Sequence, residues 1–224
     1  MLICLTGLAT AVHAKWSYTD DHIWTLSDNA QDYSWSWQED KSCADIKQDY
    51  AKRPYRSRSD NTHRGIDFHH ARGTPILAAA PGEVIATIDD YWGAGKTVII
   101  YHGQLPEGGH LFTYYMHMED IRVDEQTPVR RGQQIGTMGN TGALAGRFVH
   151  LHFATRTNSN GNFTYGKDME YSDSANFTHK NPHQYWYGAN RQSKEVIIPI
   201  YVENRDYGDR GSHSTALTLP IPCH

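Results

Sequence analysis

The middle of the chain consists of short apolar segments separated by glycine-containing turns, and this pattern limits the fold more than any other feature. Between residues 63 and 157, the segments are rich in β-branched and aromatic residues, and few windows show a helical repeat. The turns between them read APGE, WGAGK, PEGGH and GNTGALAG. The pattern predicts an all-β fold, either an antiparallel β-sandwich or a partly closed, barrel-like sheet with long loops. A short helix is expected at residues 43–52.

The stretch VHLHF at residues 149–153 places two histidines on one face of a predicted strand. Side chains alternate across a strand, so Leu151 is expected to face the core while His150 and His152 share the other face. Paired imidazoles are costly to bury without partners. The pair is therefore a candidate for a metal or catalytic site, with a packing role as the alternative.

A second candidate lies upstream in HRGIDF, where His63 and Asp67 are four residues apart. That spacing would align the two side chains on a helix, but Gly65 and the β-branched Ile66 disfavour a helix here. We expect the two side chains to converge from a loop and a strand instead. The alternative is that His63 is a surface residue and Asp67 is a hydrogen-bond acceptor in a turn.

The third candidate is His117, within the segment YYMHM. Strand alternation puts Tyr115 and His117 on one face, with Tyr114 and Met116 on the other. A histidine among aromatic residues can also be an ordinary, hydrogen-bonded core residue. Four further histidines are expected at the surface: His69, His70, His102 and His110.

Composition and charge exclude several classes of protein. The 224 residues carry 21 basic and 25 acidic side chains without a basic stripe, so no nucleic acid is expected as a partner. No apolar stretch reaches about 18 residues, so no transmembrane helix is expected. Residues 1–14 form a short apolar segment that ends in Val-His-Ala, which approximates a secretory cleavage site. We therefore predict a signal peptide there and an exported protein, either periplasmic or extracellular.

The motifs HRGIDF, YYMH, GTMGNTG and HLHF occur in one order along the chain. In that order they make residues 60–188 similar to the lysostaphin-type, LytM-like zinc endopeptidases, which are peptidoglycan hydrolases. The similarity includes the closing Asn-Pro pair at residues 181–182. It implies a zinc-dependent enzyme that uses metal-activated water to hydrolyse stem or bridge peptides of peptidoglycan.

The resemblance also implies a role for each candidate residue. One Zn²⁺ per chain would be held by His63, Asp67 and His152, the ligand positions of the H-x-x-x-D and H-x-H motifs. The catalytic histidines would be His117 and His150. The residue types suit this chemistry, because a catalytic zinc keeps three protein ligands and an open position for water. Two further imidazoles can take up the proton of the water and hydrogen-bond the developing oxyanion.

Two other functions compete with that of an active enzyme. A catalytically inactive LytM-like module, which binds the cell wall or activates another hydrolase, generally lacks ligands, whereas all five positions are filled here. A cupin would need a carboxylate shortly after H-x-H, and the residues that follow His152 read FATRT. Ala154 stands where an acidic residue is common in the family, which bears on substrate preference more than on metal binding. Direct D-alanine–diaminopimelate cross-links, glycine bridges and glycine-rich proteins are all compatible with the sequence.

The rest of the chain is expected to flank this LytM-like domain. An aromatic and acidic extension covers residues 15–59, and a C-terminal β extension covers residues 189–224. Removal of the signal peptide would leave Cys43 and Cys223, one near each end of the mature chain. In an oxidising compartment these cysteines are expected to form a disulfide, with two free thiols as the alternative.

Overall fold

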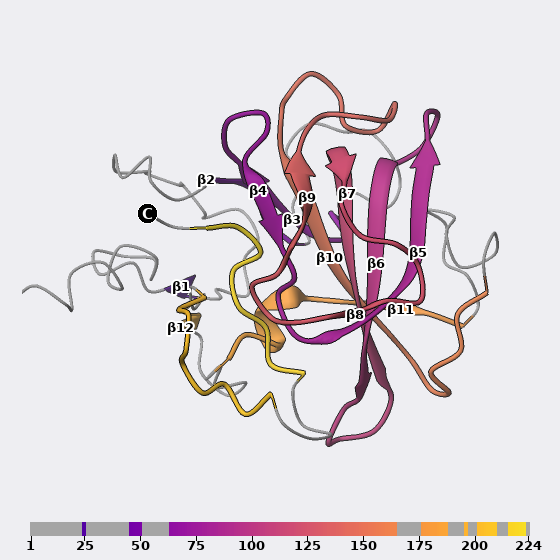
Figure 1. Ribbon diagram of the computed structural model, residues 1–224, viewed down its shortest axis with the longest axis vertical. Coiled ribbons are helices and arrows are strands. Elements are labelled where there is room, and N and C mark those ends of the chain that lie inside the picture. The colour runs from indigo at the N-terminus through magenta and orange to yellow at the C-terminus, as the bar shows by residue number, and fades with distance from the viewer. Residues whose placement is uncertain are drawn as a thin grey trace, which may run out of the picture.

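A computed structural model describes residues 24–25, 45–50, 63–164, 176–187, 195–196, 201–209 and 215–222 (Figure 1). Within these ranges there is no α-helix, and one 3₁₀ helix, η1, spans Pro182–Gln184. The strands are β1 (Trp24–Thr25), β2 (Asp45–Gln48), β3 (Ile66–His69), β4 (Pro75–Leu77), β5 (Gly82–Asp90), β6 (Gly95–Gln104), β7 (His110–Ile121), β8 (Pro128–Val129), β9 (Gln134–Met138), β10 (Leu151–Asn158), β11 (Thr178–Lys180) and β12 (Glu195–Val196).

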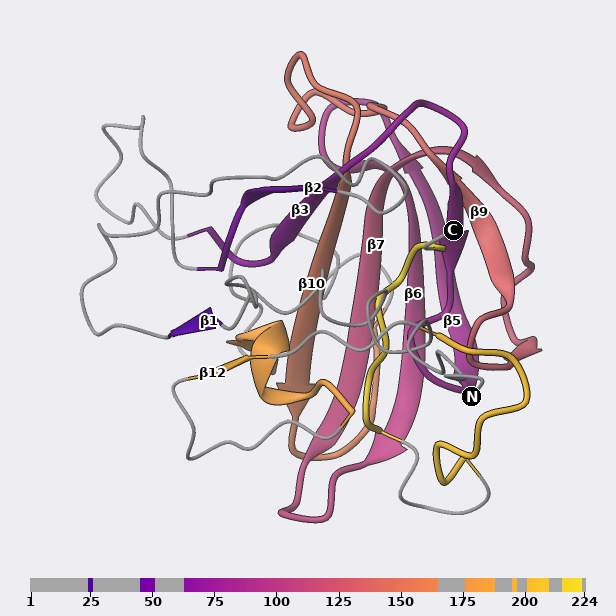
Figure 2. The ribbon, with the colours of Figure 1, turned by 90° about the vertical axis from the view of Figure 1, so that its left-hand side faces the viewer.

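Ten of these strands form one antiparallel sheet with the order β2-β3-β10-β7-β6-β5-β8. Strand β11 also pairs with β10, and β9 joins β7 to β4. Figure 2 shows β10, β7, β6 and β5 side by side, with β2 and β3 on one side of them and β9 on the other. Strands β1 and β12 pair with each other. The predicted all-β, antiparallel architecture is therefore confirmed.

The helix expected at residues 43–52 is wrong in the part of the chain that the structure describes. Asp45–Gln48 form strand β2, which pairs with β3. Ile46 is fully buried opposite Phe68, so the segment adds its apolar side chain to the core through a strand. Strand β3 offers this segment backbone hydrogen bonds and a buried partner for Ile46. These interactions outweigh the weak helical preference of so short a segment.

Strand β7 is buried on both faces and separates two clusters of apolar side chains. In the larger cluster, Tyr115 packs with Ile100 of β6 and Phe153 of β10. Tyr114 and Met116 point to the opposite face and belong to the smaller cluster. This explains why most residues from Leu111 to Met118 are apolar, since each face of the strand has its own core to fill.

The C-terminal segment closes the larger cluster. Its backbone contacts β4, where the N–H of Leu77 donates to the carbonyl oxygen of Pro220 at 2.8 Å. Three of its side chains are at most 1% exposed and lie within that cluster: Leu217, Leu219 and Ile221. The described part of the C-terminal extension is therefore part of the same hydrophobic core as the sheet.

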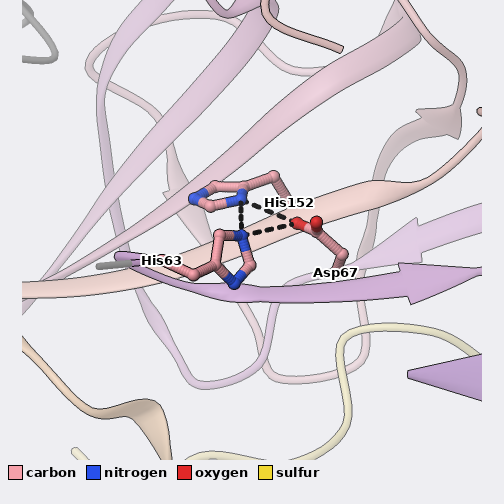
Figure 3. A group of neighbouring side chains, drawn as sticks. All are labelled: His63, Asp67 and His152. Atoms are coloured by element: carbon pink, nitrogen blue, oxygen red, sulfur yellow. Dashed lines mark hydrogen bonds and ion pairs between the residues drawn. The ribbon is translucent and has the colours of Figure 1, made fainter. Parts of the chain in front are cut away.

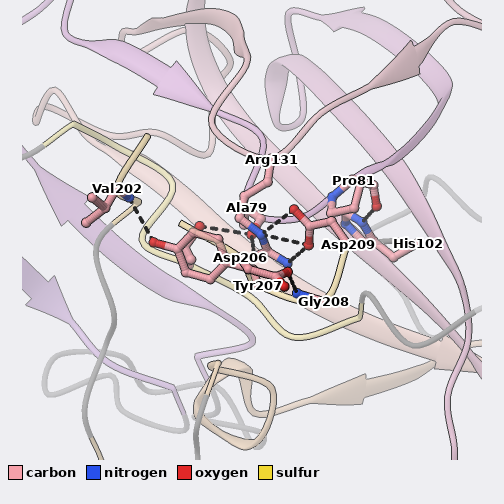
Figure 4. Close-up of polar contacts among 10 residues, drawn as sticks. Ala79, Pro81, His102, Arg131, Val202, Asp206, Tyr207, Gly208 and Asp209 are labelled. Atoms are coloured by element: carbon pink, nitrogen blue, oxygen red, sulfur yellow. Dashed lines mark hydrogen bonds and ion pairs between the residues drawn. The ribbon is translucent and has the colours of Figure 1, made fainter. Parts of the chain in front are cut away.

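A buried arginine ties residues 201–209 to this core (Figure 4). Arg131 donates from Nη1 to the carbonyl oxygen of Ala79 at 2.6 Å and from Nη2 to the carboxylate of Asp209 at 2.7 Å. Its guanidinium carbon also lies 4.9 Å from the ring centroid of Tyr207. Because a buried charge needs a partner, this arrangement holds the segment against the sheet.

The prediction that His102 faces solvent is wrong. Its side chain is buried, with Nδ1 donating to the carbonyl oxygen of Pro81 at 2.8 Å and Nε2 2.7 Å from Oγ1 of Thr113. Burial lowers the pKa of His102 to about 4, so the ring is neutral at neutral pH. His102 is buried because the segment before β5 covers this part of β6 and supplies the carbonyl oxygen of Pro81 as a hydrogen-bond acceptor. The other three histidines expected at the surface are partly exposed.

Leu151 is fully buried in the larger cluster, as its place in VHLHF predicted. Leu151→Ala is expected to reduce the free energy of unfolding by roughly 2–5 kcal/mol, because it removes buried methyl groups and leaves a cavity. Denaturant unfolding followed by circular dichroism measures this loss. Metal content per folded molecule should stay at the wild-type value, and a loss of metal without a loss of stability would contradict the assignment of Leu151 to the core.

Several predictions concern residues outside the described ranges. These are the signal peptide at residues 1–14, most of the extension at residues 15–59, and the Cys43–Cys223 disulfide. Among the described residues, no helix has the length and apolar character needed to cross a membrane.

Candidate metal centre

Three side chains, two from neighbouring strands and one from the loop before them, lie close together (Figure 3). His63 precedes β3, Asp67 lies within β3, and His152 lies directly opposite Asp67 on β10. Nδ1 of His152 is 2.8 Å from Oδ1 of Asp67, and Nε2 of His63 is 3.1 Å from both of those atoms. The expected convergence of His63 and Asp67 from a loop and a strand is therefore found. Two imidazole nitrogens and one carboxylate oxygen share a space that suits a cation.

The close approach of β3 to β10 depends on Gly65. A Cβ atom at this position would lie 2.6 Å from Nε2 of His152 and 2.7 Å from the carbonyl oxygen of Phe153. The second contact is with backbone, which cannot rotate away. Any larger residue at position 65 would crowd His152, so the space beside this ligand requires glycine between His63 and Asp67.

The protonation states fit a metal-binding set. Burial alone would raise the pKa of Asp67, but His63 and the hydrogen bonds from both imidazoles hold that pKa well below its usual range. Burial lowers the pKa of His152 to about 4, although Asp67 opposes the shift. At neutral pH the carboxylate is thus ionised and the imidazole neutral, and these are the forms that bind metal ions.

His117 reaches this centre through a bulge in β7, and the sequence-based placement of its side chain is wrong. Lys96 of β6 pairs with Met118 and Val98 pairs with Tyr115, so two residues of β7 stand opposite one residue of β6. His117 itself has a φ of 65°, in the left-handed region. The extra residue resets the alternation, so His117 leaves the face occupied by Tyr115 and joins the face of the metal centre.

His117 and His150 form a pair beside the three side chains. Their ring centroids are 4.8 Å apart, and the centroid of His117 is 6.1 Å from that of His152. Nε2 of His150 lies 3.7 Å from Oδ1 of Asp67. Burial, followed by the effects of His150 and His152, lowers the pKa of His117 to about 3, so its ring is neutral at neutral pH. All five residues singled out by the motifs are thus brought together.

A backbone carbonyl fixes the orientation of each of these two rings. Nδ1 of His117 donates to the carbonyl oxygen of Thr141 at 3.0 Å, and Nδ1 of His150 donates to that of Phe148 at 2.9 Å. A carbonyl oxygen can only accept, so Nδ1 of each ring carries a proton. In the neutral form of such a ring, Nε2 keeps a lone pair that can accept a proton.

Sequence reasoning missed Thr141. Its hydroxyl accepts from the N–H of Lys96 at 2.8 Å and donates to the carbonyl oxygen of Met118 at 2.7 Å, on either side of the bulge. A Cβ on the following Gly142 would lie 2.2 Å from the backbone nitrogen of Gly95. The motif GNTG could have indicated this role, because Thr141 is followed by Gly142, and the close approach of this turn to Gly95 requires a glycine there.

Comparison with known proteins identifies the domain. The profile of peptidase family M23 matches residues 61–163. The crystal structure of the catalytic domain of the prophage-encoded M23 protein EnpA from Enterococcus faecalis is 30% identical in sequence to this chain. The similarity covers 55% of this chain and 92% of that one, with a TM-score of 0.44. The chain belongs to peptidase family M23. Membership confirms the resemblance to lysostaphin-type, LytM-like proteins that the motifs indicated.

Two M23 relatives carry names with different functions. Peptidoglycan DD-endopeptidase ShyA of Vibrio cholerae is 36% identical over 94 residues, which are 42% of this chain and 20% of ShyA. Murein hydrolase activator NlpD of Escherichia coli is 35% identical over 98 residues, which are 44% of this chain and 24% of NlpD. This chain therefore spans about a quarter or less of either relative. M23 relatives thus include both a hydrolase of peptidoglycan and an activator of such hydrolases.

Proposed function

We propose that the chain is a zinc endopeptidase that hydrolyses peptide cross-links of bacterial peptidoglycan. The observation that carries the proposal is the convergence of His63, Asp67 and His152, with His117 and His150 beside them. A site with ligands alone would bind a metal ion. The two additional imidazoles, each directed by a backbone carbonyl, are groups for proton transfer that hydrolysis needs.

The donor set fits Zn²⁺. Two neutral imidazoles and one carboxylate are ligands that zinc prefers, and three protein ligands are typical of a catalytic zinc site. When bound there, Zn²⁺ would act as a Lewis acid and make a water molecule nucleophilic near neutral pH. Nδ1 of His63 donates to the carbonyl oxygen of Asp49 at 2.8 Å, so Nε2 is the nitrogen that would face the ion.

The two paired imidazoles, His117 and His150, would have different roles in the reaction. Nε2 of His150 lies 3.7 Å from Oδ1 of Asp67 and is placed to take the proton of the attacking water. His117, across the pair, has no donor on Nε2 while its ring is neutral, so it would hydrogen-bond the oxyanion that forms on the peptide carbonyl once its Nε2 has taken up a proton. Both rings keep Nδ1 engaged with a carbonyl while Nε2 exchanges a proton, so neither has to turn during the reaction.

The names of two relatives support a substrate class. ShyA is named as a peptidoglycan DD-endopeptidase, and NlpD as an activator of murein hydrolases. We propose stem or bridge peptides of peptidoglycan as the substrate, and an exported location, periplasmic or extracellular, where that polymer is found. An activator without its own activity is the second candidate, which the NlpD similarity favours and the complete set of five residues disfavours.

Digestion of purified, cross-linked peptidoglycan tests this function. Full-length protein that has been stripped with a chelator and reloaded with zinc should release fragments in which each hydrolysed bond leaves one new carboxyl terminus and one new amino terminus, as mass spectrometry would detect. The chelated protein should release none. The fragment masses also show whether a direct cross-link or a glycine bridge is cut. Zinc-loaded protein that releases nothing, but accelerates a second hydrolase added to the same peptidoglycan, would replace the enzyme by the activator.

A further inference from the structure

The ring of His63 is oriented by a residue from outside the matched family domain. Its Nδ1 donates to the carbonyl oxygen of Asp49 at 2.8 Å. Asp49 follows strand β2, in which Gln48 pairs with Asp67 of β3. This register brings the end of the N-terminal segment beside the metal centre. The position of the Asp49 carbonyl therefore fixes the direction in which Nε2 of His63 points.

Asp49 is itself held by a residue from beyond the other end of the family match. Nε2 of His183, in η1, lies 2.8 Å from Oδ1 of Asp49. The indole nitrogen of Trp186 donates to Nδ1 of His183 at 2.8 Å. Because an indole N–H can only donate, Nδ1 of His183 is the acceptor, and the proton of the neutral ring sits on Nε2. His183 thus donates to the Asp49 carboxylate in a charge-assisted hydrogen bond.

The hydrogen-bond chain from Trp186 through His183 to Asp49 is buried, and it also packs against the residue that follows the second histidine ligand. Asp49, His183 and Trp186 are each at most 3% exposed. The ring of Trp186 stacks on Phe153, with centroids 5.8 Å apart and an interplanar angle of 17°. Phe153 directly follows His152 in β10. A buried hydrogen-bond chain of this kind has little freedom, so a change at His183 is transmitted to Asp49.

We propose that His183 and Asp49 are positioning residues for the metal ligand His63, supplied by the segments that flank the M23 match. The inference rests on the proposed zinc site. The carboxylate of Asp49 fixes the backbone that carries its own carbonyl, and His183 fixes the carboxylate. The two flanking segments are then required for high zinc affinity as well as for stability.

A matched pair of substitutions at His183 separates positioning from packing. In His183→Gln, the side-chain amide nitrogen can replace Nε2 and still donate to Asp49, but the bond from Trp186 is lost. In His183→Asn, the side-chain oxygen can replace Nδ1 and still accept from Trp186, but the bond to Asp49 is lost. Each variant loses one buried hydrogen bond, so the two should lose similar stability. Only the Asn variant loses the contact that leads to His63.

Zinc affinity is the decisive readout, measured on full-length apoprotein by competition with a chromophoric chelator. The Kd for zinc should rise about 10–100-fold in His183→Asn, as expected when a partner of a ligand is removed, and stay near the wild-type value in His183→Gln. The visible absorption spectrum of the Co²⁺-loaded Asn variant should also differ from that of the wild type. Should His183→Asn fail to fold, Asp49→Asn keeps the shape but weakens the same bond, and should raise the Kd in the same direction.

The outcomes are distinguishable. Equal zinc affinity and equal Co²⁺ spectra in the wild type and both His183 variants would overturn the positioning role and leave the zinc site intact. A wild-type protein that binds no zinc would remove the proposed function, and this inference with it.

Discussion

His152→Ala should abolish zinc binding and hydrolysis together, whereas His150→Ala should retain most of the zinc and lose about 10²–10⁴-fold in kcat. The two residues share one face of β10 but differ in what they reach. Nδ1 of His152 is 2.8 Å from the Asp67 carboxylate and 3.1 Å from Nε2 of His63, whereas Nε2 of His150 is 3.7 Å from that carboxylate. His117→Ala should behave like the His150 variant, because its ring pairs with His150.

These results require metal content and turnover to be measured on the same preparations, with circular dichroism to confirm the fold. Leu151→Ala is the control between the two histidines, since it affects stability without touching the site. Loss of zinc in His150→Ala with retention in His152→Ala would reverse the assignment. Full zinc and full activity in both histidine variants would make the pair structural.

Gly65→Ala should lower zinc affinity by at least as much as the loss of a supporting contact, about 10–100-fold. The added methyl group would stand 2.6 Å from Nε2 of His152 and 2.7 Å from the carbonyl oxygen of Phe153. Relief of these contacts requires β3 to move away from β10, which separates Asp67 from His152. Isothermal titration of the apoprotein with zinc measures the effect.

Gly108→Ala is the matched control for Gly65→Ala. Gly108 has a φ of 93°, so alanine there is strained, but nothing lies within 4 Å of the added Cβ. It lies in the turn between β6 and β7, and His117 lies near the other end of β7. The control should lose stability by about 1 kcal/mol and keep wild-type zinc affinity. Equal affinities in the two alanine variants would show that Gly65 is not required for the space beside His152.

The positions of the three proposed ligands could be predicted because they depend on sequence patterns within short segments. Alternation in VHLHF is sufficient to place Leu151 in the core and His152 on the opposite face, and the structure agrees. The glycine in HRGIDF disfavours a helix, which leaves a loop and a strand for His63 and Asp67. The antiparallel sheet itself follows from the repeated glycine turns and β-branched segments.

The placement of His117 failed because a bulge has no reliable local signature. Whether β7 gains an extra residue depends on how β6 pairs with it, which is a long-range property. The strand β2 was taken for a helix for a related reason, since its partner β3 lies far along the chain. His102 was misplaced because the carbonyl of Pro81 that receives it belongs to a different segment.

The supporting contacts were invisible for a chemical reason. Three rings near the centre are held by backbone carbonyls, those of Asp49, Thr141 and Phe148, and a carbonyl is present at every residue. No residue type in the sequence marks such a partner. Only the fold shows which carbonyl lies within reach of which ring.

X-ray absorption at the zinc edge of the wild-type protein tests the central claim most directly. If His63, Asp67 and His152 bind zinc, the spectrum should fit nitrogen and oxygen neighbours only, with the outer-shell scattering of two imidazoles. His152→Ala should remove the signal, and Leu151→Ala should leave it unchanged. A spectrum that requires sulfur neighbours, or that persists unchanged in His152→Ala, would contradict the assignment of the site.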